Sequence, residues 1–139
     1  MPSQNQTRVS WVLQVAAAVI MGQTLFFKFS GAPEPIYIFT TLGAEPYGRW
    51  LAGVSELVAV VLLLWPMMAG VGALLGVGVM SGALLAHLTT KLGIEVLGDG
   101  GLLFSLGVVV WVACAVIVFI RRDQLMAQAK TLRQRFLPA

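Results

Sequence analysis

The chain has 139 residues, of which 58% are hydrophobic and only 11% are charged. Soluble domains carry about 25% charged residues, so this composition excludes an ordinary soluble protein and predicts one embedded in a membrane. The formal net charge of +3 follows from basic residues at the predicted ends of membrane spans, and it gives no indication of nucleic-acid binding.

Four apolar segments are long enough to cross a bilayer, since a spanning helix needs about 20 mostly apolar residues. They cover roughly residues 9–28, 49–65, 67–88 and 101–120, which leaves room for one membrane domain over residues 1–139. The predicted fold class is all-α. We expect a polytopic four-helix bundle with a short interfacial segment between its first two helices and an amphipathic tail helix within residues 121–139.

The first span continues to Phe27, so we expect it to be retained and not cleaved as a signal peptide. Its small and polar residues recur at alternating steps of four and three, which places them on one stripe facing the bundle: Ser10, Gln14, Ala17, Met21, Thr24 and Lys28. After this span, residues 35–42 predict a short helix at the interface or over the end of the bundle. Glu45 precedes Pro46 at the predicted start of the next helix, where an acid complements the helix dipole.

Pro66 is predicted to end the second spanning helix and to start the third, because proline cannot continue a helix across its own position. The third span contains five glycines, including two Gly-x-x-x-Gly spacings at residues 72/76 and 78/82. Such spacings let helices approach closely in a membrane, so the third helix is the predicted packing centre. Close approach of its backbone to a ligand is the alternative.

The loop after the third span carries Lys91, Glu95 and Asp99, and Asp99 is the predicted N-cap of the fourth helix. In the tail, four apolar residues share one helix face and basic residues lie elsewhere, which suits a helix on an anionic membrane surface: Leu125, Ala129, Leu132 and Phe136. Basic residues near span ends favour the cytoplasmic side. Both termini are therefore predicted to be cytoplasmic.

Three ionisable residues, Lys28, Glu56 and His87, lie within or at the ends of the spans. Because a charge at the centre of a bilayer costs about 2.5–3.5 kcal/mol, such residues are usually paired, solvated or functional. All three fall in the same half of the membrane, and we expect Glu56 and His87 to be in contact with Lys28 nearby. Two interpretations stay open: a structural ion pair, also open to Arg49, or a site for a polar head group or a proton.

Five further polar residues would support this site from the same side: Glu45, Arg49, Lys91, Glu95 and Asp99. One histidine and one glutamate are too few for a usual zinc or di-iron centre, so no metal site is predicted. Met80 and His87 share a helix face and cannot clamp one haem iron. Cys114 is the single cysteine, which excludes an internal disulfide or dithiol. No residue is identified as catalytic.

The chain resembles the DoxX-like family of small four-helix membrane proteins. The resemblance rests on Glu56, on the four-span layout and on three sequence runs: FFKFSGAPEP at 26–35, LGAEPYGRW at 42–50 and VMSGALLAHLTTKLGIEVLGDGGLLF at 79–104. It covers most of the chain from Leu25 to Phe119. The motifs are specific as a set and weak singly.

This resemblance implies a multi-pass protein of the bacterial inner membrane that acts as an accessory subunit of a quinone-linked redox system. No cofactor is intrinsic to the chain, so a bound quinone or a redox partner protein would carry electrons. The alternative is a non-enzymatic membrane chaperone or assembly factor, and a small-solute carrier is disfavoured because one bundle leaves little room for alternating access. Expected partners are the lipid bilayer, a membrane redox protein and a second copy of the chain.

Overall fold

The computed structural model describes residues 1–137, which form helices joined by turns and loops. The elements are α1 (Gln4–Ser30), α2 (Pro33–Thr41), α3 (Tyr47–Leu64), α4 (Ala69–Thr89), α5 (Leu102–Ile120) and α6 (Arg122–Phe136). Four of them, α1, α3, α4 and α5, are long and apolar enough to cross a membrane. The predicted all-α membrane fold is confirmed.

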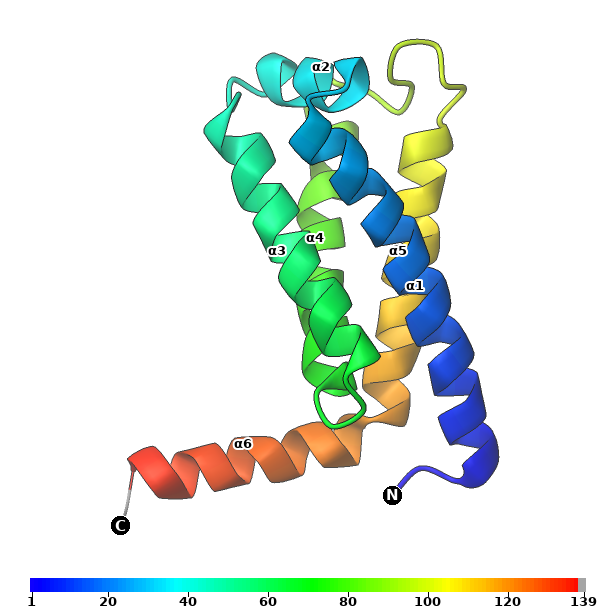
Figure 1. Cartoon of the computed structure of the whole chain (residues 1–139), viewed down its shortest axis with the longest axis vertical. Coiled ribbons are helices and arrows are strands. Elements are labelled where there is room, and N and C mark those ends of the chain that lie inside the picture. Colours follow the sequence, from blue (N-terminus) through cyan, green and yellow to red (C-terminus); the bar gives the residue numbers. More distant parts are fainter. Residues whose placement is uncertain (138–139) are drawn as a thin grey trace.

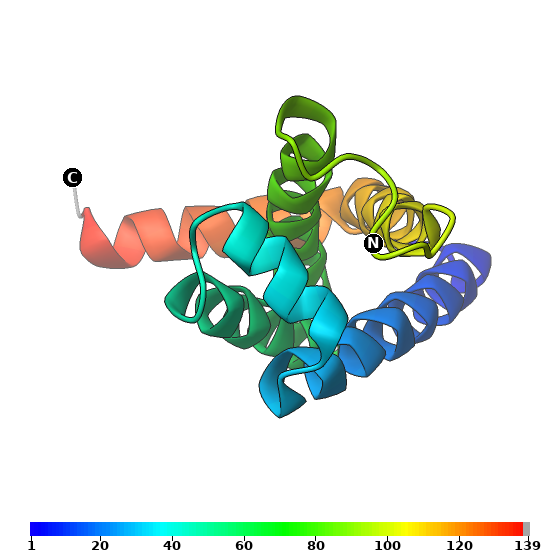
Figure 2. The same ribbon diagram turned by 90° about the horizontal axis from the view of Figure 1, so that it is seen from above.

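The four spanning helices form a ring in which α1 packs on α3, α3 on α4, α4 on α5 and α5 on α1. Figure 1 shows α2 lying across one end of this bundle, while α6 extends sideways from the other end, near the N-terminus. Viewed from above in Figure 2, α2 crosses over the ring between α3 and α1. The short segment predicted between the first two spans therefore covers the end of the bundle. This is one of the two arrangements that we expected.

The outer surface of the bundle is apolar and requires a lipid environment. Only 22% to 33% of the most apolar 18 residues of each spanning helix are buried inside the bundle. Large aliphatic side chains such as Val12, Val61, Leu74 and Val109 are about half exposed or more. Exposed apolar surface of this extent is stable only in contact with lipid, so the chain is a multi-pass membrane protein.

The core is built from small residues and a few large ones, including Met21, Leu63 and Ile117, which are at most 1% exposed. Two glycines of α4 permit this close packing. A Cβ on Gly72 would lie 2.5 Å from the backbone nitrogen of Leu63, and one on Gly76 would lie 2.7 Å from the sulfur of Cys114. The predicted packing role of the 72/76 spacing is confirmed.

The second glycine spacing behaves differently. A Cβ on Gly78 or on Gly82 would meet nothing within 4 Å, and both residues are exposed. Within the described residues, this spacing therefore does not pack helices together as predicted. Its glycines lie where α4 borders a cavity, described below, instead of where it touches another helix.

Some predicted helix boundaries are displaced, each for a local reason. The helix α1 begins at Gln4, five residues before the predicted start at Val9, because Ser3 and Gln6 form a reciprocal capping box with bonds of 2.8 and 3.2 Å. The helix α4 begins at Ala69 and not at Met67, since residues 65–68 form a turn closed by the Met68 N–H on the Trp65 carbonyl. The last two residues of the predicted tail lie outside the described residues.

Candidate functional site

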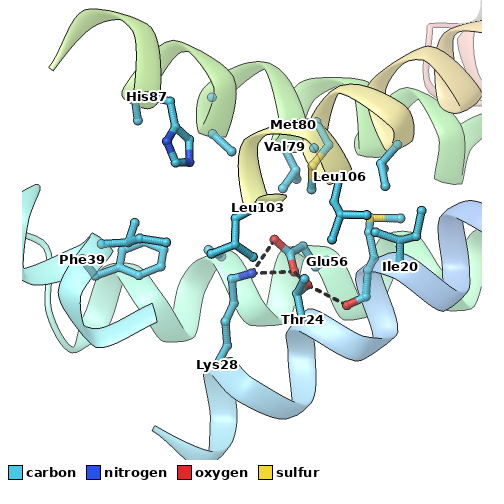
Figure 3. Close-up of a pocket in the computed structure, with 18 of the residues that line it drawn as sticks. Ile20, Thr24, Lys28, Phe39, Glu56, Val79, Met80, His87, Leu103 and Leu106 are labelled. Atoms are coloured by element: carbon cyan, nitrogen blue, oxygen red, sulfur yellow. Dashed lines mark hydrogen bonds and ion pairs between the residues drawn. The ribbon is translucent and has the colours of Figure 1, made fainter. Parts of the chain in front are cut away.

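A cavity of about 360 Å³ lies inside the α2 end of the bundle, and all three predicted site residues line it. Lys28 comes from α1, Glu56 from α3 and His87 from α4, while Phe39 of α2 and Leu103 of α5 close the remaining sides. Figure 3 shows these side chains converging on the cavity. The walls are mostly apolar, and only a few side chains contribute polar groups to them.

Lys28 and Glu56 form a buried ion pair between α1 and α3. The Lys28 Nζ lies 3.0 Å from each carboxylate oxygen of Glu56, and the two side chains are 14% and 5% exposed. The hydroxyl of Thr24, one turn before Lys28, donates to the Glu56 Oε2 at 3.0 Å. Thr24 was predicted only as part of the α1 stripe. Its hydroxyl proves to be a third member of the charged cluster.

Arg49 makes polar contacts on the outer side of the Lys28–Glu56 pair. Its guanidinium pairs with Glu45 four residues earlier, at 2.8 Å from Nη2 to Oε1, and it also donates to the backbone carbonyl of Lys28. Carbonyls in the last turn of a helix lack an intrahelical donor, so Arg49 caps the end of α1. Arg49 and Glu45 therefore support the site indirectly, by fixing the backbone that carries Lys28.

His87 is 8% exposed, and its ring points from the last turn of α4 into the cavity (Figure 3). The Nδ1 atom lies 2.6 Å from the carbonyl oxygen of Gly93, in the loop that follows the helix. Phe104 of α5 packs edge-on against the ring, with centroids 5.7 Å apart. The loop and α5 thus fix both the position and the orientation of the imidazole.

The expected direct contact between Glu56 and His87 is wrong. Among the described residues, the Glu56 carboxylate bonds to Lys28 and Thr24, and no hydrogen bond or ion pair joins it to His87. Figure 3 shows His87 and the Lys28–Glu56 pair apart from each other within the cavity. The His87 ring is bonded instead to Gly93, which lies in the loop directly after α4.

Part of the cavity wall is exposed on α4. Gly78, Gly82 and Ala83 of α4 line it and are exposed, so this part of its wall adjoins the lipid-facing surface. A second cavity of about 300 Å³, bordered by α1, α2 and α5, shares Lys28 and Phe39 with the first.

Asp99 organises the loop before α5 and also borders the second cavity. Its carboxylate accepts the backbone N–H groups of Val96, Gly101 and Leu103 at 2.8 to 2.9 Å, while Gly101, with a φ of 83°, occupies the N-cap position. Burial raises the pKa of Asp99, but these three donors and a smaller effect of His87 outweigh it and hold the pKa below its usual range. The prediction that Asp99 is the N-cap is therefore wrong by two residues, although its carboxylate accepts the Leu103 N–H in the first turn of α5.

Lys91 and Glu95 are exposed and line neither of the two cavities. The structure therefore does not bring them to the polar site. They lie in the loop of residues 90–101. This loop reaches the site at two points: the Gly93 carbonyl contacts His87, and Leu92 lines the first cavity.

A second buried polar cluster, at the α6 end, was missed by the sequence analysis. The basic residues near span ends were interpreted only as a topology signal. One of them, Arg121, is 7% exposed and donates to Ser10, Gln14, Gln124 and the carbonyl of Pro66 at 3.0 to 3.1 Å. Burial lowers the pKa of this guanidinium. The available signal was the presence of Ser10 and Gln14 on the inward stripe, at the level where the fourth span ends.

The arrangement in the cavity can bind a molecule that is mostly apolar and carries a polar head. Comparison with protein-family models, curated proteins and solved structures finds no match to this chain.

Proposed function

We propose that this chain binds the head group of a lipid-soluble amphiphile of the quinone class in the cavity at the α2 end. In this role it is a DoxX-like accessory subunit of a membrane redox system. The main observation behind the proposal is the cavity. Its volume is about 360 Å³, its walls are mostly apolar, and only a few polar side chains line it. Binding sites for small molecules typically have a volume of about 300–1,000 Å³ and this mixture of surfaces.

The Lys28–Glu56 pair supports a neutral polar ligand rather than a charged one. Each charge is already compensated by the other at 3.0 Å, so a ligand ion would have to compete with a formed salt bridge. A neutral ring carrying oxygen atoms makes no such demand, because the ammonium can donate a further hydrogen bond while remaining paired. Quinones meet this requirement.

Access from the membrane supports a lipid-soluble ligand. The exposed wall at Gly78, Gly82 and Ala83 lies on a spanning helix, while α2 covers the adjacent end of the bundle. A molecule dissolved in the bilayer can reach such an opening without crossing water. The ligand supplies the redox chemistry, and the protein residues bind and orient it.

Mild purification followed by mass spectrometry of the extracted lipids and of the co-purifying proteins tests this proposal. We expect a quinone enriched over the bulk lipid in the wild type and lost in Glu56→Gln. Glu95→Gln, which removes an exposed acid outside both cavities, is the matched control and should retain the quinone. Equal quinone content in all three proteins, at the level of the bulk lipid, would reject the proposal.

A second candidate function is a membrane chaperone or assembly factor. The observation that favours it is the exposed backbone at Gly78 and Gly82, where small residues leave space for a client helix to approach closely. In that case a client protein, and no quinone, co-purifies, and Glu56→Gln has no effect on its recovery. Gly82→Leu would abolish it.

The proposed location is the bacterial inner membrane with both termini in the cytoplasm. The distribution of basic residues supports this orientation, because the N-terminal end of α1, where Arg8 lies in the sequence, and the basic helix α6 are at the same end of the bundle (Figure 1). The cavity then lies in the outer half of the membrane. A redox partner would meet the protein within the bilayer or at its outer surface.

A further inference from the structure

The free nitrogen of His87 indicates which kind of head group the cavity accepts. The Nδ1 atom lies 2.6 Å from the carbonyl oxygen of Gly93, and a carbonyl can only accept a hydrogen bond. In the neutral imidazole, Nδ1 therefore carries the proton. The Nε2 atom is left as an acceptor, and it has no hydrogen-bond partner among residues 1–137.

Within the described residues, no side chain donates a hydrogen bond to this nitrogen. The Lys28 ammonium and the Thr24 hydroxyl both donate to Glu56, the cavity wall around His87 is mostly apolar, and the Asp99 carboxylate, which interacts with His87 electrostatically, has no proton to donate. The His87 ring is 8% exposed and lines a cavity large enough for a ligand, so its Nε2 can be reached by a molecule that fills this space. The missing donor is thus expected from the molecule that fills the cavity.

We propose that the head group in this cavity carries a hydroxyl that donates to the His87 Nε2, so that the site selects the reduced, hydroquinone or phenol form of a ring amphiphile. This inference rests on the proposed function and narrows its ligand class. An oxidised quinone offers only carbonyl acceptors, which cannot satisfy Nε2. The hydroquinone differs from it by two O–H donors at the same positions.

The test compares 2-decylhydroquinone, kept reduced, with its dimethyl ether, which has the same ring and chain and no O–H donor. Binding to the wild type in nanodiscs is measured by calorimetry. One hydrogen bond of about 1.4 kcal/mol corresponds to a tenfold change in affinity, so we expect the hydroquinone to bind about tenfold more tightly. In His87→Phe, which retains an aromatic ring beside Phe104, this preference should disappear.

The chain contains a single histidine, so labelling with ¹⁵N-histidine gives an independent readout on the unmutated protein. We expect the nitrogen signals of a protonated Nδ1 and an unprotonated Nε2, and a shift of the Nε2 signal when the hydroquinone is added. Equal affinities for the two compounds, or an Nε2 that is protonated, would overturn the inference while leaving the proposed function intact. Failure of both compounds and of the oxidised quinone to bind would overturn both.

Discussion

The ammonium of Lys28 and the carboxylate of Glu56 lie 3.0 Å apart and join α1 to α3 beside an open cavity. Neither side chain is adjacent to the other in sequence, and both come from helices that face lipid on their outer sides. The pair therefore stabilises the bundle at the point where the cavity interrupts its packing. Mutations of this pair can therefore test the stability of the bundle separately from the binding of a ligand in the cavity.

Glu56→Ala should destabilise the protein by about 3–5 kcal/mol, because it leaves the Lys28 ammonium buried without its partner. Glu56→Gln should cost less, since the amide still accepts from Lys28 and Thr24. The double variant Lys28→Met/Glu56→Leu should recover much of the loss, because apolar residues replace both charges. Unfolding in mixed micelles measures these differences, with exposed Glu95→Ala as the control. A Glu56→Ala protein as stable as the control would contradict a structural role for the pair.

The two glycine spacings of α4 should respond oppositely to alanine. Gly72→Ala places a methyl group 2.5 Å from the backbone nitrogen of Leu63, and overpacking of this kind costs about 1–3 kcal/mol. Gly82→Ala meets nothing within 4 Å and gains helix propensity, so its stability should be unchanged or slightly higher. The free energy of unfolding of both variants decides this. A similar loss in both would show that Gly82 is packed against another helix.

Arg121 should be far more important to the fold than its neighbour Arg122. Arg121→Ala removes the donor to Ser10, Gln14 and the Pro66 carbonyl, and each buried group left unsatisfied costs about 1–3 kcal/mol. Arg122 is more than half exposed, so Arg122→Ala is a matched control with the same loss of charge. Thermal unfolding in detergent should show a lower midpoint for Arg121→Ala alone. Equal midpoints would reject the structural role of Arg121.

The helix α6 should lie on the cytoplasmic membrane surface. Leu125 packs on Gly70 of α4, and Leu132 continues the same apolar face beyond the bundle, flanked by basic residues such as Arg133 and Arg135. Gln134 lies about 200° around the helix from Leu132. In a Cys114→Ser protein, Leu132→Cys should resist a water-soluble thiol reagent in anionic vesicles while Gln134→Cys reacts.

The same reagent reports orientation. In intact cells Gln134→Cys should react only after the membrane is made permeable, since the tail is predicted to face the cytoplasm. Replacing Lys130, Arg133 and Arg135 by glutamine should weaken the protection of Leu132→Cys, because each basic residue adds about 1 kcal/mol of attraction to anionic lipid. Equal reaction at positions 132 and 134 would show that α6 is free in solvent.

The spanning helices could be predicted because lipid imposes length and hydropathy on every one of them. The inward faces were also predictable from spacing: Ser10, Gln14, Ala17 and Met21 of α1 are buried as expected. Boundaries were less certain where a local bond decides them, as at the Ser3 capping box. Hydropathy carries no information on such bonds.

The candidate site was predicted by its residues and not by its contacts. Charge within an apolar span identified Lys28, Glu56 and His87, and all three line one cavity. Which groups pair depends on the tertiary structure, and residue spacing does not decide among the possible partners. The hydrogen bond between the His87 Nδ1 and the Gly93 carbonyl was therefore not predicted. The buried role of Arg121 was hidden for a related reason, because a basic residue at a span end usually faces water.

Photolabelling in native membranes tests most directly whether the cavity binds a quinone-class ligand. An azido-quinone is activated by light, and the labelled peptides are identified by mass spectrometry. We expect labels on α4 between Gly78 and His87, competed by unlabelled quinone and lost in Gly82→Leu, which fills the opening. Gly22→Leu, at another helix position with nothing within 4 Å, is the control and should label normally. Labelling that is spread over lipid-facing residues and unchanged by Gly82→Leu would contradict the assignment of the cavity as the binding site.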